Sequence, residues 1–121
     1  MAKYQAGDIV LVEIPFTDLT GTKKRPACVL STHGEDYLVA FLTSRLEHAR
    51  RTDVILQRSP ANGLAVDSAV LVGKLFTSHV SLIERKLGVC STAERRAVIG
   101  AVIEKLRQGL GRILTLPPFR R

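Results

Sequence analysis

The sequence predicts a β-rich α+β fold, a small β-barrel or half-barrel closed by a C-terminal helix. Short apolar runs rich in β-branched residues recur between turn signals over residues 8–76, as they do in small barrels. A later segment has the capping residues and the periodicity of an amphipathic helix. The chain of 121 residues suits one domain, with a barrel over residues 1–90, a helix over 91–110 and a short basic tail over 111–121.

The expected strands are apolar runs that are too short for helices. The first begins after Gly7 and ends before Pro15. The second begins at Pro26, because proline is tolerated at the first position of a strand. A turn or a short helix is expected around residues 81–85. The five expected strands cover residues 8–14, 26–31, 37–43, 54–56 and 69–76.

The expected helix has clear start and stop signals. Ser91 and Glu94 fit a capping box, in which each side chain accepts the backbone N–H of the other residue. Gly109 and Gly111 are stop signals. One face of this helix is expected to be apolar and to pack on the barrel or on a second copy of the chain. That face contains Ile99, Val102, Ile103, Leu106 and Leu110.

The formal net charge of +7 points to a polyanionic partner, such as nucleic acid, an acidic protein or a membrane surface. Solubility alone is the alternative explanation of such a charge. No apolar run approaches the ~20 residues of a membrane helix, and the stretch before Gly7 is too short for a signal-peptide core. We therefore expect a cytoplasmic protein without membrane association.

The two cysteines do not indicate a metal or cofactor site. Cys28 lies in an apolar run, which favours a buried and reduced thiol, and Cys90 lies just before the expected helix. Two isolated cysteines form neither a zinc motif nor a disulfide framework, although a pairing between them stays open. The sequence therefore predicts no metal and no cofactor.

Three segments, taken in order, carry a resemblance to a known family. Residues 18–26 read DLTGTKKRP, and the strand continues to Ser31 as ACVLS. A second strand ends in Thr43-Ser44, and a third segment runs from Gly63-Leu64 to Thr77. In this combination the chain resembles the MazF/PemK family of type II toxin–antitoxin toxins, in particular the PemK-like branch.

The resemblance implies an SH3-like barrel of the CcdB/MazF/PemK kind and a two-fold homodimer. It also implies a toxin that inhibits translation and growth as a sequence-specific endoribonuclease. Such toxins cut single-stranded RNA or mRNA without a metal and leave 2′,3′-cyclic phosphate and 5′-hydroxyl ends. A cognate antitoxin, expected to be acidic and encoded adjacently, holds them inactive.

Two residues match the family's catalytic positions. Arg25 offers a planar guanidinium that fits phosphate oxygens, and the proline that follows biases its backbone toward an extended conformation. Thr43 places a hydroxyl at a strand end, where it can donate to a phosphate oxygen or, alternatively, bond the local backbone. Ser44 is able to share this role.

Further candidates for RNA binding or catalysis lie near these two. Lys24 follows Lys23 in a basic run that can track phosphates, although a solvated loop explains the run equally well. Phe16 is the best candidate to stack on a base. A second basic segment follows Ser44, is interrupted by Glu47 and Asp53, and contains Arg45, His48, Arg50, Arg51 and Arg58.

The residue that moves the proton is not identified by the motifs. His48 has the right intrinsic chemistry, but an exposed loop histidine is the ordinary alternative. Many relatives carry an acidic or polar residue, Gln and then Arg-Thr in the fifth strand, whereas residues 73–77 here read GKLFT. Lys74 either replaces a lost cation or is an edge lysine. Two alternative functions therefore stay open, a non-catalytic gyrase poison on the same fold and a basic nucleic-acid-binding module.

Overall fold

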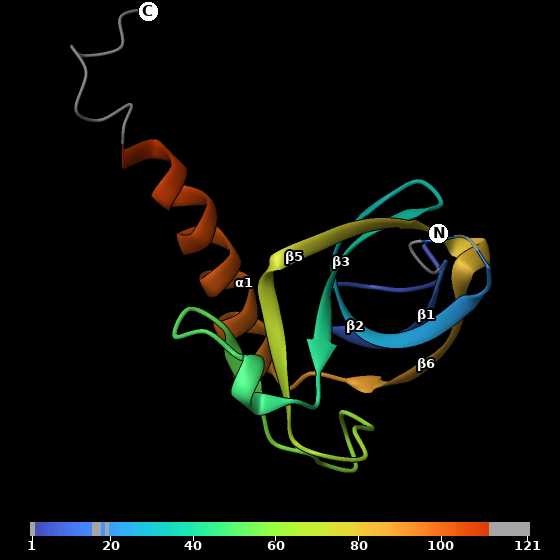
Figure 1. The fold of residues 1–121 in the computed structure, drawn as a ribbon, viewed down its shortest axis with the longest axis horizontal. Coiled ribbons are helices and arrows are strands. Elements are labelled where there is room, and N and C mark those ends of the chain that lie inside the picture. Colours follow the sequence, from blue (N-terminus) through green and yellow to red (C-terminus); the bar gives the residue numbers. More distant parts are fainter. Residues whose placement is uncertain (1, 16–17, 19, 112–121) are drawn as a thin grey trace, which may run out of the picture.

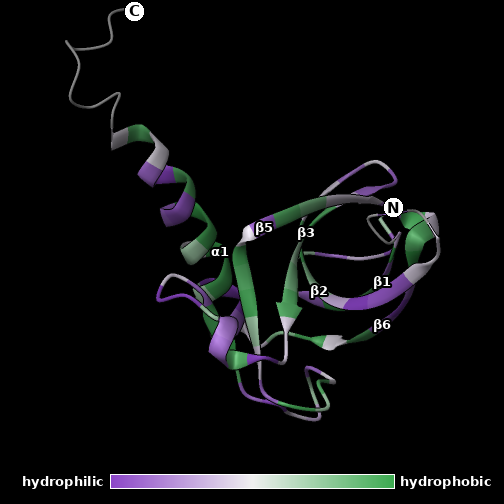
Figure 2. Cartoon of the chain, in the orientation of Figure 1, coloured by the Kyte–Doolittle hydropathy of each residue, from purple (hydrophilic) through white to green (hydrophobic). Residues whose placement is uncertain are grey.

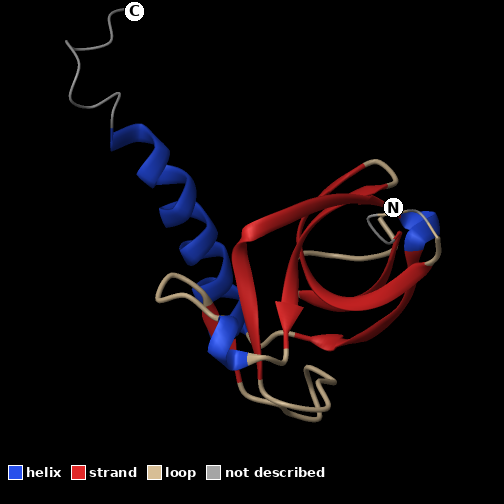
Figure 3. Ribbon diagram, viewed as in Figure 1, coloured by secondary structure: helices blue, strands red, loops and turns tan. Residues whose placement is uncertain are grey.

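The computed structural model describes residues 2–15, 18 and 20–111 and contains a curled sheet of six strands with one long helix beside it (Figures 1 and 3). The strands pair in the order β4-β5-β3-β2-β1-β6, and all neighbours are antiparallel. The predicted fold class is therefore confirmed. The strands are β1 (Asp8–Pro15), β2 (Thr22–His33), β3 (Asp36–Thr43), β4 (Val54–Leu56), β5 (Ser68–His79) and β6 (Ile83–Val89). The helices are α1 (Thr92–Arg107) and the short 3₁₀ segments η1 (Leu46–His48), η2 (Val80–Leu82) and η3 (Gln108–Leu110).

The curled sheet buries apolar side chains on both of its faces. In β1, Ile9 packs in a cluster that lies toward α1, while the next residue, Val10, packs in a second cluster. Their partners on β2 follow the same division, because Ile9 pairs with Cys28 and Val10 pairs with Ala27. Successive side chains in a strand point to opposite faces. Burial on both faces thus explains why these strands read as unbroken apolar runs.

Two strands are several residues longer than the sequence predicted, and one was missed. β2 begins at Thr22, so that Pro26 lies inside the strand, and β5 extends to His79. The short helix expected around residues 81–85 is present as η2, but it ends at Leu82, and β6 occupies the rest of that segment. This strand pairs with β1 at the edge of the sheet, and most of its side chains are exposed or half-buried. It therefore lacks the apolar pattern that identifies a strand.

The helix starts as predicted. The Glu94 N–H donates to Ser91 Oγ at 3.0 Å, and the Ser91 N–H donates to Glu94 Oε1 at 2.8 Å, which completes the capping box. The last turns are 3₁₀ rather than α-helical, because α1 ends at Arg107 and η3 follows. Among the helices that the structure describes, none has the length and apolar character to cross a membrane.

The predicted apolar face of the helix was partly wrong. Val98 and Val102 are the buried residues of α1, with Ile99 and Ala101 packed beside them. The remaining predicted members of the face are exposed, namely Ile103 at 49%, Leu106 at 64% and Leu110 at 46%. Figure 2 shows apolar residues on the outer part of α1, which extends away from the barrel. The helix thus contacts the sheet mainly through its first turns.

Candidate functional site

A groove of about 870 Å³ opens where β2, β3, β5 and α1 meet. Its wall is strongly cationic, and Asp53 is the single acid among the described residues that line it. The apolar and neutral lining residues are Ile14, Pro15, Phe41, Leu42, Thr43, Ser44, Leu71 and Gly73. The basic ones are Lys23, Arg25, Arg45, His48, Arg50, Lys74 and Lys105.

Arg25 and Thr43 lie in this groove together. The last pair of the β2–β3 ladder on this side is Ala27 with Phe41. Arg25 and Thr43 each lie two residues beyond this pair, so strand alternation keeps them on the same face as Ala27 and Phe41. Arg25 is exposed and Thr43 is half-buried, so a guanidinium and a hydroxyl face the same solvent-filled space.

The Thr43 hydroxyl remains free to donate a hydrogen bond. Its oxygen accepts the Arg45 N–H at 3.1 Å, which is the local backbone bond that the sequence left as an alternative. A hydroxyl has one donor and two acceptor positions, so this bond leaves the O–H free to donate. The bond also fixes the direction of the chain as it leaves β3, and Ser44, the next residue, is exposed in the groove.

The loop after β3 is fastened to the sheet by Asp53. One oxygen of this carboxylate accepts the Arg50 N–H at 2.8 Å, and the other accepts the Val72 N–H of β5 at 3.0 Å. Both oxygens are thus engaged with backbone donors. The clamp holds in place the loop that carries Arg45 and His48 into the groove.

Strand β5 turns a sharp corner, as Figure 1 shows. β3 and β5 pair on both sides of Phe41, and residues 71–74 of β5 stand opposite this single residue. Extra residues in one strand bend it and redirect its side chains. Gly73 and Lys74 lie in this irregular stretch and both line the groove.

Lys105 reaches the groove from the helix, and the sequence analysis did not find it. It is half-buried and lies one helical turn beyond Val102, on the face of α1 that also carries Val98 and packs on the barrel. Its Cε lies 3.4 Å from the point where a Cβ on Gly73 would be. The lysine stem therefore lies over the bare backbone of β5. Phe41 is half-buried in the groove wall and packs against the second apolar cluster.

A match to a family model identifies the family of this chain. Residues 5–106 match the model described as PemK-like, MazF-like toxin of type II toxin-antitoxin system.

The chain belongs to this toxin family.

Solved structures support the same fold. A MazE–MazF complex (Form-II) from Deinococcus radiodurans is 21% identical with a TM-score of 0.67, covering 89% of this chain and 96% of that one. An endoribonuclease in complex with its cognate antitoxin, from a Mycobacterial species, is 18% identical with a TM-score of 0.66 and coverages of 86% and 95%. The toxin MazF-mt6 of Mycobacterium tuberculosis is 21% identical with a TM-score of 0.62 and coverages of 81% and 96%. No curated protein matches the toxin's sequence.

Not every candidate residue of the toxin reaches the groove. Lys24 lies outside the groove lining and pairs with Glu84, with 2.6 Å between Nζ and Oε1. The hydrogen bond and the charge of this carboxylate raise the pKa of the Lys24 ammonium. Adjacent residues of a strand point to opposite faces, which separates Lys24 from Arg25. Phe16 lies outside the residues that the structure describes.

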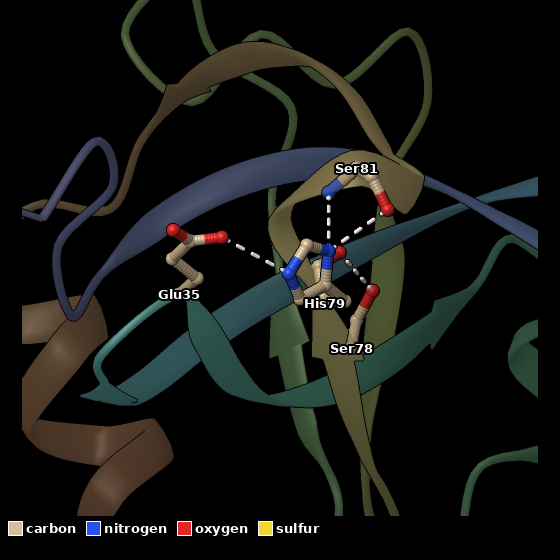
Figure 4. Close-up of polar contacts among 4 residues, drawn as sticks. All are labelled: Glu35, Ser78, His79 and Ser81. Atoms are coloured by element: carbon tan, nitrogen blue, oxygen red, sulfur yellow. Dashed lines mark hydrogen bonds and ion pairs between the residues drawn. The ribbon is translucent and has the colours of Figure 1, made fainter.

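A second polar cluster lies away from the groove, at the end of β5 (Figure 4). His79 Nε2 lies 3.1 Å from a Glu35 oxygen, and His79 Nδ1 lies 2.8 Å from Ser81 Oγ and accepts the Ser81 N–H at 3.1 Å. Glu35 and His79 are both well exposed. The cluster caps η2 and ties it to the turn between β2 and β3, so its role in the toxin is structural.

The two thiols of the toxin are buried side by side. Cys28 Sγ and Cys90 Sγ are 4.0 Å apart, and both cysteines are free. The hydrogen bond to Cys90, together with burial, raises the pKa of the Cys28 thiol, and the same bond lowers the pKa of Cys90. The expectation that Cys28 is buried and reduced agrees with this arrangement. Within the described ranges, no group of side chains is arranged to hold a metal ion.

Proposed function

We propose that this toxin is an endoribonuclease that cuts single-stranded RNA by attack of the ribose 2′-hydroxyl on the neighbouring phosphate. The observation that supports this most directly is that Arg25 and Thr43 share one cationic groove. A single strand exposes its 2′-hydroxyl and has the freedom to bring it in line with the leaving oxygen. The products are then a 2′,3′-cyclic phosphate and a 5′-hydroxyl.

Fixed hydrogen-bond donors stabilise the negative charge that develops during the reaction. As the 2′-oxygen attacks, negative charge grows on the non-bridging oxygens of the phosphate. Arg25 carries a permanent positive charge and donates two parallel N–H bonds to such oxygens. The Thr43 O–H, held in place through its bond with Arg45, adds a neutral donor. Donors fixed in advance of the reaction lower the barrier because they need no reorganisation.

Two protons must also move, one from the 2′-hydroxyl and one to the 5′-oxygen. His48 lines the groove and lies at the end of η1. Histidine is the residue type best suited to proton transfer near neutral pH. Asp53 fits this task less well, since both of its oxygens accept backbone N–H groups. We therefore assign to His48 the removal of the 2′-hydroxyl proton, while the departing 5′-oxygen takes its proton from water. The proposed mechanism uses no metal ion.

Partners follow from the charge and shape of the toxin. The groove lining carries many basic groups and one acid, so an acidic antitoxin, encoded adjacently, would compete with RNA for it. The exposed apolar residues on the outer part of α1 fit a protein interface, which supports a homodimer. RNA, antitoxin and dimer all suit action in the cytoplasm.

The test is cleavage of single-stranded RNA by the purified toxin in excess EDTA, with mapping of the new ends. We expect cuts that end in cyclic phosphate, at short preferred sequences. Arg25→Ala should lower the rate on the order of 10²-fold or more, as for other removed transition-state donors. Lys24→Ala is the matched control, because it removes a neighbouring charge outside the groove.

Three results would contradict the proposal. Full activity of Arg25→Ala would show that the guanidinium does not stabilise the reaction. Intact RNA together with growth arrest and trapped DNA breaks would instead indicate a gyrase poison. Salt-sensitive binding of nucleic acid without damage to it would indicate a simple binding module.

A further inference from the structure

The groove holds more positive charge than one phosphate needs. Apart from Arg25, basic side chains reach it from β2, from the loop after β3, from β5 and from α1. The ion pairs among the described residues are Lys24–Glu84, His79–Glu35, Lys86–Asp8 and Arg107–Glu104, and none of them includes a groove cation. Cations that gather without acidic partners favour an anion with several charges.

Lys105 is held in a defined position among these cations. Val98, Ala101, Val102 and Lys105 follow the spacing that keeps residues on one face of a helix. The stem of Lys105 is supported by the backbone of Gly73, where no side chain stands in the way, and its Nζ lies 4.0 Å from the position of an added Cβ. A buried stem with a solvated ammonium is the usual arrangement for such a lysine. Its neighbours Ile103 and Leu106 are exposed, so Lys105 marks the last contact of α1 with the sheet.

The separation of the strands places this lysine away from the scissile phosphate. Arg25 is on β2, and the Gly73–Lys74 corner is on β5, with β3 between them. Neighbouring paired strands are about 4.8 Å apart, so the backbones of β2 and β5 are roughly 10 Å apart where both pair with β3. In the proposed reaction the scissile phosphate already takes its donors from Arg25 and Thr43. A continuous RNA strand carries the next phosphate along its backbone.

We propose that Lys105, together with Lys74, forms a second phosphate-binding site that holds a phosphate flanking the scissile one. The inference rests on the proposed RNA cleavage and specifies how the strand is positioned. Lys105 acts through binding rather than in the chemical step. The toxin therefore recognises a stretch of single strand longer than the cleaved linkage, and α1 contributes directly to substrate binding.

The test is the kinetics of Lys105→Gln on single-stranded RNA. We expect KM to rise about fivefold, the size of a partly exposed charge pair, while kcat stays unchanged. The slope of log affinity against log salt should fall by about 0.7, the value for one lost contact with a single strand. Lys105→Arg should restore both quantities. Arg107→Gln is the matched control, because it removes a charge from the same helix outside the groove and should change neither quantity.

Binding of an uncleavable 2′-O-methyl oligonucleotide separates this inference from the proposed function. If the unmodified toxin neither cuts RNA nor binds this probe, the proposed function itself fails. If the toxin cuts RNA but Lys105→Gln keeps the KM and the salt slope, the second site is overturned and the cleavage proposal stands. A fall in kcat with constant KM would also overturn it. Lys74→Gln, a change at an exposed residue, gives a second test should Lys105→Gln not fold.

Discussion

Asp53 gives the sharpest test of how the groove is built. Its two carboxylate oxygens accept the Arg50 and Val72 N–H groups, at 2.8 and 3.0 Å. Asp53→Asn keeps one accepting oxygen and turns an NH₂ group toward the second N–H. That donor is then left without an acceptor in a half-buried place. An unsatisfied donor of this kind costs about 1–3 kcal/mol.

The loss should appear in both stability and activity. For a domain of this size, each kcal/mol shifts the melting temperature by roughly 3–6 °C. Urea unfolding followed by circular dichroism measures the free energy of unfolding directly. The loop with Arg45 and His48 is freed from β5, so cleavage should also fall about tenfold or more through misplacement of groove side chains.

Asp67→Asn is the control for this experiment. Asp67 accepts a single N–H, from Arg58 at 2.8 Å, and an asparagine oxygen can keep that bond. We expect a change of less than about 0.5 kcal/mol, as for ordinary surface substitutions. Equal stability and equal cleavage for the Asp53 and Asp67 variants would refute the clamp.

Three further predictions concern stability. Ser91→Ala removes one half of the capping box and should lower the free energy of unfolding by about 1 kcal/mol in a denaturant titration. Gly63→Ala should cost more than about 2 kcal/mol by the same measurement, since Gly63 has a φ of +70° and its added Cβ would lie 1.9 Å from the Leu87 carbonyl oxygen; unchanged stability would contradict the local geometry. The Cys90 bond and burial raise the pKa of Cys28 above its ordinary 9.0, so the unfolded chain loses that proton first. Stability should thus fall as the pH rises above about 9, by up to about 1.4 kcal/mol per unit, and Cys28→Ala should remove this part of the pH dependence in parallel melts.

Local signals in the sequence predicted local structure well. The start of α1 depends on contacts between residues three apart, and the Ser91–Glu94 box was therefore visible in the sequence. The central strands were visible because both of their faces are buried. β6 was not, since it lies at the sheet edge and its side chains are mostly exposed, which leaves no apolar pattern to detect.

The orientation of α1 depends on tertiary contacts, and the sequence pattern misread it. Ile103 and Leu106 fit an apolar stripe as well as Val98 does, and hydrophobicity alone does not distinguish a face that packs on the sheet from one that stays exposed. Lys105 was not recognisable as a groove residue for the same reason, because the helix has to be placed over β5 first.

The candidate site was only partly accessible to sequence reasoning. Arg25 and Thr43 were selected through the family motif, and the fold places both in the lining of one groove. The motif did not separate Arg25 from Lys24, although strand alternation sends the two side chains to different surroundings. The corner in β5 that presents Lys74 arises because β5 has more residues than β3 between two paired positions. No single residue of the sequence predicts such an irregularity.

The outer end of α1 has a consequence for how the molecule behaves in solution. Its first turns are anchored by Val98 and Val102, whereas Leu106 and Leu110 are exposed. An isolated stretch of helix gains little from its own backbone bonds. Amide hydrogens near Leu106 should therefore exchange with deuterium far sooner than those near Val98, and dilution should lower the helical signal if a second surface normally covers this end.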